Sequence, residues 1–307
     1  MTRREEFDMW KVILAMLALI TCLCVQGAAR GIDDAASEIP FTFEKGYVIV
    51  QAKILRRMPV EMILATGAEH STFNGGLMDK YKLSLAYTFD DPKRCNLADC
   101  TYTFSNITNL TLGNLKPVSL SMRLSTLEKI EKRIGRPVFG VLGADFFKGR
   151  VVQFDFTRKL ARFLPALTDG AATNNKTLPT AERIVLRMTF YDEYTTLPIA
   201  EEVTFDGKKI KTILDTGTAA VVALSPAATK QLGLLLPPDK SAPRTGSVVV
   251  LRLGGYELTN VPVLLYGNGM GFDRDAKEFG AIAGTGLLQN FVTTFDFRGK
   301  VIILEHI

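Results

Sequence analysis

Short runs of apolar residues, many of them β-branched, recur along most of this 307-residue chain. Clear examples are the segments 47–54, 247–253 and 300–304. Runs of this kind, bounded by Gly, Pro or Asn, predict strands. Helical periodicity is brief and is clearest at 225–234. There Ser225 can cap the helix, Pro226 can fill its first position and Gly233 can end it. The pattern predicts an all-β chain with short helices.

One pattern occurs twice along the chain. The matching segments, at offsets of 150, 141 and 141 residues, are 60–68 with 210–218, 140–147 with 281–288, and 153–156 with 294–297. A repeat this long indicates two related lobes, each folding as one all-β unit. The stretch between the copies is rich in Thr, Asn and Ala, which is typical of a linker. We expect lobe 1 at 40–166, a linker at 167–182 and lobe 2 at 183–307.

The N-terminal 27 residues have a different character. Arg3, Arg4 and Lys11 precede an uncharged apolar stretch at 12–25, and small residues follow it. This order is typical of a secretory signal peptide. The stretch is short for a hydrocarbon core about 30 Å thick, so an uncleaved membrane anchor is the second interpretation. We therefore expect a secreted or periplasmic, extracytoplasmic protein, with membrane attachment only through an uncleaved segment 1–27.

The strongest chemical signal is the tripeptide that ends an apolar strand in each copy. The tripeptides are Asp215-Thr216-Gly217 in lobe 2 and Ala65-Thr66-Gly67 in lobe 1. Three letters alone are weak evidence, so their context matters. In both copies an apolar strand comes before the turn, and a second apolar segment ending in Gly follows much later, at 140–143 and 281–284. The repeat thus places Ala65 where lobe 2 has Asp215.

This arrangement resembles the retropepsin-like aspartic proteases over nearly all of the chain after residue 27. The resemblance implies two retropepsin-like or pepsin-like acid protease β-barrel lobes, related by the internal repeat. In that family two aspartates face each other and share a proton, which supplies a general base and a general acid. Asp215 is then the catalytic residue. Thr216 and Thr66 would bond across the interface, and Gly217 and Gly67 would allow the tight turns.

Lobe 1 departs from the family pattern at its central position, since Ala65 carries no proton and no charge. Asp215 would stand alone in a monomer. Glu69 follows the first turn, and the resemblance implies a contact with a peptide backbone there rather than catalysis. No other residue near Ala65 suggests a substitute acid.

Two functions follow from this departure. The chain is an aspartic endopeptidase acting on polypeptides, which would need a homodimer to bring two Asp215 side chains together. Alternatively it is a catalytically inactive pseudo-protease, which binds peptides through its cleft or serves as a structural envelope module. Enzymatic activity stays undecided at this stage. Ala65 can be natural or an engineered substitution.

Composition limits the other options. The net charge of +5 is spread along the chain, so we expect no nucleic-acid partner. Two histidines, His70 and His306, are too few to indicate a metal site, and we expect no organic cofactor. Cys95 and Cys100 predict a local disulfide in an exported chain. Flap hairpins are expected near 94–104 and 244–253.

Overall fold

A computed structural model describes residues 36–55, 57–90, 101–165, 183–190, 196–239, 241–268 and 279–307. The predicted signal segment 1–27 and the predicted linker 167–182 lie outside these residues, as do Cys95 and Cys100. No helix within the described ranges is both long and apolar enough to cross a membrane.

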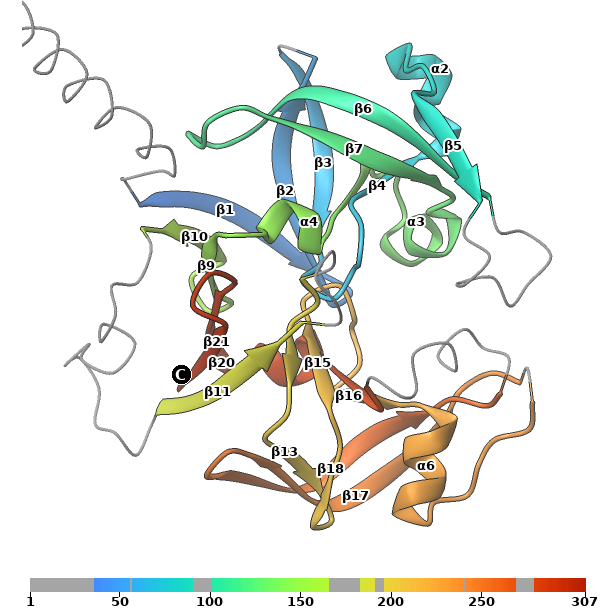
Figure 1. Cartoon of the computed structure of the whole chain (residues 1–307), viewed down its shortest axis with the longest axis vertical. Helices are drawn as coiled ribbons and strands as arrows, with labels where there is room; N and C mark the ends of the chain where they lie inside the picture. Colours follow the sequence, from blue (N-terminus) through green and yellow to red (C-terminus); the bar gives the residue numbers. More distant parts are fainter. Residues whose placement is uncertain are drawn as a thin grey trace, which may run out of the picture. The chain divides into compact units, whose positions relative to one another are not determined.

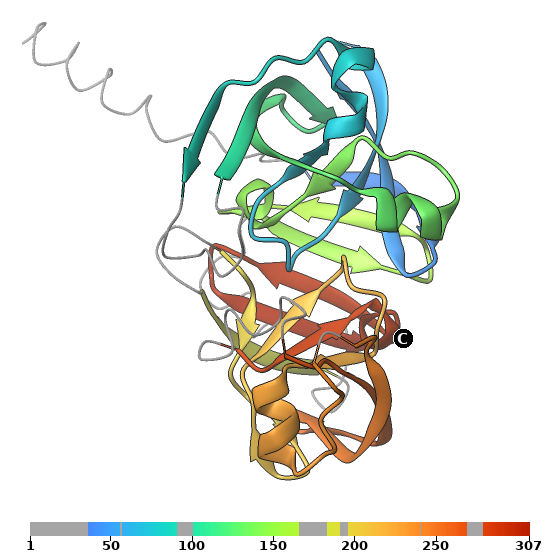
Figure 2. The ribbon, with the colours of Figure 1, turned by 90° about the vertical axis from the view of Figure 1, so that its right-hand side faces the viewer.

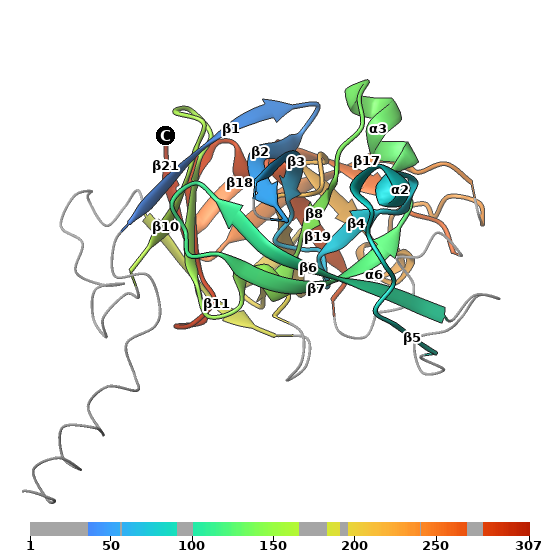
Figure 3. The same ribbon diagram turned by 90° about the horizontal axis from the view of Figure 1, so that it is seen from above.

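Lobe 1 consists of strands β1 to β10 and their short helices (Figure 1). Its strands are β1 (Ser37–Glu44), β2 (Tyr47–Ile54), β3 (Met58–Leu64), β4 (Thr72–Asn74), β5 (Tyr87–Asp90), β6 (Thr101–Leu112), β7 (Val118–Ser125), β8 (Gly140–Leu142), β9 (Val151–Asp155) and β10 (Leu160–Leu164). Its helices are η1 (Gly75–Leu77), α2 (Met78–Tyr81), α3 (Glu128–Ile134) and α4 (Ala144–Phe147). Strands β6 and β7 form the long hairpin that crosses the view in Figure 3.

Lobe 2 consists of strands β11 to β21 and two short helices. Its strands are β11 (Arg183–Thr189), β12 (Ile199–Ala200), β13 (Val203–Phe205), β14 (Lys208–Lys209), β15 (Thr212–Asp215), β16 (Val222–Leu224), β17 (Arg244–Leu253), β18 (Tyr256–Leu265), β19 (Ala281–Gly284), β20 (Phe291–Asp296) and β21 (Val301–His306). Its helices are α6 (Pro226–Leu232) and α7 (Thr285–Leu288).

The strand pairings of lobe 1 form a closed barrel. Going round it, β2 pairs with β3, β3 with β8, β8 with β4, β4 with β7, β7 with β6, and β6 again with β2. Lobe 2 repeats the central part of this order, with β15, β19, β16, β18 and β17 in the places of β3, β8, β4, β7 and β6. Each parallel pair in one lobe matches a parallel pair in the other. The predicted class, two β lobes with short helices, is therefore confirmed.

A six-stranded antiparallel sheet joins the two lobes. Its strands follow the order β1, β10, β9, β20, β21 and β11. Figure 2 shows the yellow-green strands of lobe 1 beside the red strands of lobe 2. At the junction Gln153 lies opposite Thr294 and its Nε2 donates to the Thr294 Oγ1 over 3.0 Å. These two residues are equivalent in the repeat, so the axis relating the lobes passes between them.

The elements expected from the sequence formed close to their predicted bounds. The segment 47–54 is β2, and Ser225 caps α6 by accepting a hydrogen bond from the backbone N–H of Ala228. Gly233 ends α6 in the left-handed conformation. The flap hairpin expected near 244–253 falls on β17, which forms an antiparallel hairpin with β18 and also pairs with β13. Its role as a flap stays a prediction. Its counterpart at 94–104 lies mostly outside the described residues.

Candidate functional site

Each of the two turns follows a strand held between parallel and antiparallel neighbours. β3 runs parallel to β8 and leads to Ala65, and β15 runs parallel to β19 and ends at Asp215. The strands are apolar because they lie inside the lobes, where Leu64 and Leu214 are fully buried. This packing fixes the position of each turn before any polar contact forms.

Two threonines connect the turns in a reciprocal way. The Thr66 hydroxyl donates to the Leu214 carbonyl and the Thr216 hydroxyl to the Leu64 carbonyl, both over 2.8 Å. Each hydroxyl also accepts the other threonine's backbone N–H, over 3.1 Å in both cases. Both threonines are fully buried. The predicted cross-interface role of Thr66 and Thr216 matches this geometry.

The Asp215 carboxylate accepts three hydrogen bonds. Its Oδ1 receives the backbone N–H of Gly217 over 2.7 Å and that of Gly67, from the other lobe, over 2.8 Å. Its Oδ2 receives the Thr218 hydroxyl over 2.7 Å. None of these donors is an acid. One carboxylate therefore collects the backbone donors of both turns.

Ala65 lies against the opposite turn with its methyl group. The side chain is 4% exposed, and a Cβ added at Gly217 would lie 2.5 Å from the Ala65 Cβ. The equivalent contact on the other side is between Gly67 and Asp215, where an added Cβ would also lie 2.5 Å from the Asp215 Cβ. Both glycines are therefore required by close approach of the turns. The lobe 1 turn thus has the same close glycine and threonine contacts as the lobe 2 turn but carries no carboxylate.

Residues after the first turn have structural contacts. Glu69 and His70 lie 3.8 Å apart, and the His70 ring meets Phe104 edge-on at 6.1 Å between centroids. Ser71 is fully buried, and its backbone N–H donates to the Asp145 carboxylate over 2.9 Å. The Ser71 hydroxyl donates to the same carboxylate and accepts the backbone N–H of Gly143, so it connects three segments of lobe 1. The contact of Glu69 with a peptide stays a prediction.

Several residues at the site had no prediction from the sequence. Thr218 holds Asp215, and its counterpart in lobe 1 is Ala68. Thr285 donates its hydroxyl to the Gly46 carbonyl of lobe 1 over 2.7 Å, and Thr196 donates to the Ala144 carbonyl over 2.7 Å. The alignment of the copies could have found Thr218, since it immediately follows the tripeptide. Contacts to backbone carbonyls leave no such signal.

Two other carboxylates follow apolar strands and accept hydrogen bonds from the backbone of the next turn. Asp155 accepts the backbone N–H of Arg158 over 2.9 Å, and Asp296 accepts that of Gly299 over 2.7 Å. Within the described ranges no group of three or more His, Cys, Asp or Glu side chains could hold a metal ion.

No protein-family model and no curated protein matches the chain in sequence. Solved structures do match it in fold. The aspartic proteinase from Irpex lacteus aligns with a TM-score of 0.51 and 14% identity, over 89% of this chain and 97% of that one. Basic 7S globulin from soybean aligns with a TM-score of 0.47 and 11% identity, over 90% and 95%. The first likeness shows that the chain has an aspartic-proteinase fold.

Proposed function

We propose that this chain is a retropepsin-like pseudo-protease that binds extended polypeptides between its two lobes without hydrolysing them. The observation that carries the proposal is Ala65, a methyl group at the position opposite Asp215, in a site that keeps the threonine and glycine contacts of both turns. The fold supplies the class of ligand by analogy, since an aspartic proteinase acts on polypeptides.

Hydrolysis by this type of site needs a base and an acid together. One carboxylate takes a proton from the attacking water while the other donates a proton to the carbonyl oxygen. Asp215 can accept a proton, but its three partners are two backbone amides and a hydroxyl. No second acid stands opposite it, because Ala65 has nothing to donate. Peptide binding, in contrast, depends on main-chain hydrogen bonds and shape, which need no second carboxylate.

An active homodimer of second lobes is the weaker alternative. Such a dimer would need a second Thr216 and a second Gly217 across the interface. Thr216 is already bonded to Thr66, and Gly217 already lies against Ala65. Lobe 1 of the same chain would have to leave before a second lobe 2 could enter.

The setting of this binding protein is also part of the proposal. The segment 1–27 supports export to a secreted or periplasmic location, and the Cys95 and Cys100 spacing supports a disulfide there. An uncleaved 1–27 would instead anchor the protein to a membrane. The partners we propose are polypeptides, with neither nucleic acid nor cofactor.

The test compares hydrolysis of an unbiased peptide mixture, at acidic and neutral pH, by the wild type and two variants. The double variant A65D/A68T would recreate in lobe 1 the Asp and Thr pair of lobe 2, and A68T alone is its matched control. We expect no cleavage by the wild type or by A68T. The double variant should cleave at acidic pH, about 10²–10⁴-fold above the wild-type background, which is the usual gain from a positioned acid or base.

Two outcomes would contradict the proposal. Cleavage by the wild type that disappears in Asp215→Asn would make the chain an endopeptidase that works with one carboxylate. Failure of the immobilised wild type to retain any peptide from the mixture, measured by mass spectrometry, would instead leave a structural module without a peptide ligand.

A further inference from the structure

The two lobes follow the same path through their first helices and then diverge. After α2 the Leu83 N–H donates to the Met78 carbonyl over 3.0 Å, and after α6 the Leu234 N–H donates to the Thr229 carbonyl over 3.0 Å. Both helices end with a left-handed residue just before that leucine. Up to this point the strand before the helix, the helix and its left-handed end follow one another in the same order in both copies. Beyond it the chain takes two different directions.

In lobe 2 the segment 234–239 crosses the end of β18. A Cβ added at Gly267 would lie 2.5 Å from the carbonyl oxygen of Pro238 and 3.2 Å from that of Pro237. Pro237 is buried there. Lobe 2 thus covers the end of this strand with a proline-containing stretch of its own chain.

In lobe 1 the corresponding stretch turns away and becomes β5. The Ala86 N–H donates to the Phe104 carbonyl of β6 over 2.7 Å, and the Tyr87 ring stacks on Phe104 with 5.0 Å between centroids. The offset of 141 residues that relates the later parts of the repeat places Thr126 at the position of Gly267. The pairing of β4 with β7 and of β16 with β18 agrees with that alignment. In the part of lobe 1 that the structure describes, no segment corresponding to 234–239 covers the end of β7.

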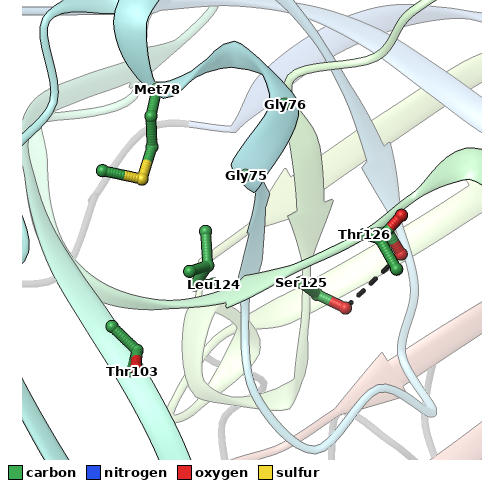
Figure 4. Close-up of a pocket in the computed structure, with 7 residues that line it drawn as sticks. All are labelled: Gly75, Gly76, Met78, Thr103, Leu124, Ser125 and Thr126. Carbon is green, nitrogen blue, oxygen red and sulfur yellow. Dashed lines mark hydrogen bonds between the residues drawn. The ribbon is translucent and has the colours of Figure 1, made fainter.

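An open pocket of about 540 Å³ lies where the cover is missing (Figure 4). Its volume is within the usual range of ligand pockets, roughly 300–1,000 Å³. Among the described residues that line it, none is charged and none belongs to the turns around Ala65 and Asp215. The residues that matter for recognition are Gly75, Gly76, Met78, Thr103, Leu124 and Thr126.

We propose that this lobe 1 pocket is a second peptide-binding site, which takes an uncharged, proline-containing extended segment of a partner polypeptide. The template is the chain itself, since segment 234–239 occupies the equivalent position in lobe 2. An extended proline-rich segment is preformed, so binding orders it at low entropic cost. The Thr103 and Thr126 hydroxyls can donate to its free carbonyls, while Met78 adapts to its rings. This site is independent of the cleft and of its proposed function.

The probe is a fluorescent peptide with the sequence of residues 234–238, which ends before Asp239 and so has no charged side chain; it is titrated with the full chain and followed by anisotropy. We expect saturable binding to the wild type. Gly76→Leu should weaken binding at least about tenfold, because Gly76 lines the pocket and a leucine there would take up space that the peptide needs. The substitution fits the fold, since the nearest atom to an added Cβ is Asn74 Oδ1 at 3.4 Å. Gly255→Leu is the matched control, since nothing lies within 4 Å of its added Cβ.

A second measurement needs no variant. Amide shifts of the wild type on adding the peptide should move at Gly76, Thr103 and Thr126, and a peptide with both prolines replaced by alanine should bind more weakly. Absence of saturable binding, equal affinity of Gly76→Leu and Gly255→Leu, or shifts confined to the turns at 65–68 and 215–218 would overturn the proposal.

Discussion

The hydroxyl groups of Thr66 and Thr216 connect the two turns with four hydrogen bonds, and none of these involves a carboxylate. The groups are fully buried, so a lost bond leaves a backbone N–H or carbonyl without a partner. The threonines therefore determine the shape of the site, whereas Asp215 determines its chemistry.

Thr216→Val tests whether the threonine hydroxyls determine the shape of the site. The change removes the bonds to the Leu64 carbonyl and the Thr66 N–H, so the free energy of unfolding in urea should fall by about 2–4 kcal/mol. Thr216→Ser keeps the hydroxyl and should lose about 1 kcal/mol or less. Thr293→Val is the matched control, because the buried Thr293 Oγ1 has no hydrogen-bond partner in the described structure. Equal losses in Thr216→Val and Thr293→Val would contradict the role of the threonine pair.

At the residue scale, the sequence alone predicted the site residues whose amino-acid type is distinctive in the alignment of the two copies. Asp215, Ala65 and the two threonines followed from aligning the copies, and the structure brings all four together. The bond from the Gly67 N–H to Asp215 was not predicted. Every residue has a backbone amide, so a donor of this kind has no signature in the sequence.

At the scale of elements, the parallel pairing of β15 with β19 brings backbone very close to backbone. Gly284 ends β19, and an added Cβ would lie 2.2 Å from the Thr218 carbonyl oxygen. Its counterpart Gly143 would place a Cβ 2.6 Å from the Ala68 carbonyl. The glycine at the end of each apolar segment thus allows the strand to pass beneath the turn.

Gly284→Ala should therefore destabilise the fold by about 1–3 kcal/mol, since the obstructing atom is backbone and cannot rotate away. The measurement is the thermal or urea midpoint of the variant against the wild type. Gly255→Ala, at an open turn with nothing within 4 Å, should be neutral or slightly stabilising. Similar midpoints for both variants would show that the strand can shift without cost.

Local elements were predictable where local forces decide them. β2 and α6 follow from their own residues, because alternation, an N-cap and a Gly stop act over a few positions. The flap role expected near 244–253 stays a prediction, because the same alternation occurs in any half-buried strand. Only the pairing partners β13 and β18 identify that segment as part of the barrel.

At the scale of the whole molecule, side chains near Tyr266 link the lobes. Burial raises the pKa of Tyr266 above its ordinary value near 10. The nearby Tyr47 of lobe 1 raises this pKa further, whereas Arg133 of lobe 1 lowers it. The folded chain keeps the phenol proton at a pH where the unfolded chain has lost it. The contribution of Tyr266 to stability is complete below about pH 10 and is lost as the pH rises through the folded pKa.

Tyr266→Phe should remove the loss of stability that accompanies ionisation of Tyr266 at high pH. Between about pH 9 and 11, the free energy of unfolding should fall less steeply for the variant than for the wild type. Tyr87→Phe, which removes an exposed phenol, is the control. Parallel pH profiles for the wild type and Tyr266→Phe would contradict the raised pKa of Tyr266.

The six-stranded sheet was the part of the architecture that sequence reasoning did not reach. The repeat predicted two lobes, but the pairing of β9 with β20 joins residues about 140 positions apart, and its register depends on both lobes. Side-chain alternation is equally compatible with many partners. The position of Gln153 opposite Thr294 could be found only from the folded chain.

The threonine and glycine contacts that hold the two turns together do not depend on a carboxylate at position 65. This independence has a consequence for how such a protein evolves. Codons for alanine and aspartate can differ by a single nucleotide, and the turn around position 65 is held by Thr66 and by glycine contacts whichever residue stands there. A point mutation can therefore remove or restore the second acid without first requiring a repair of the fold. Hydrolysis becomes a trait that a lineage can lose and regain while it keeps the same folded scaffold.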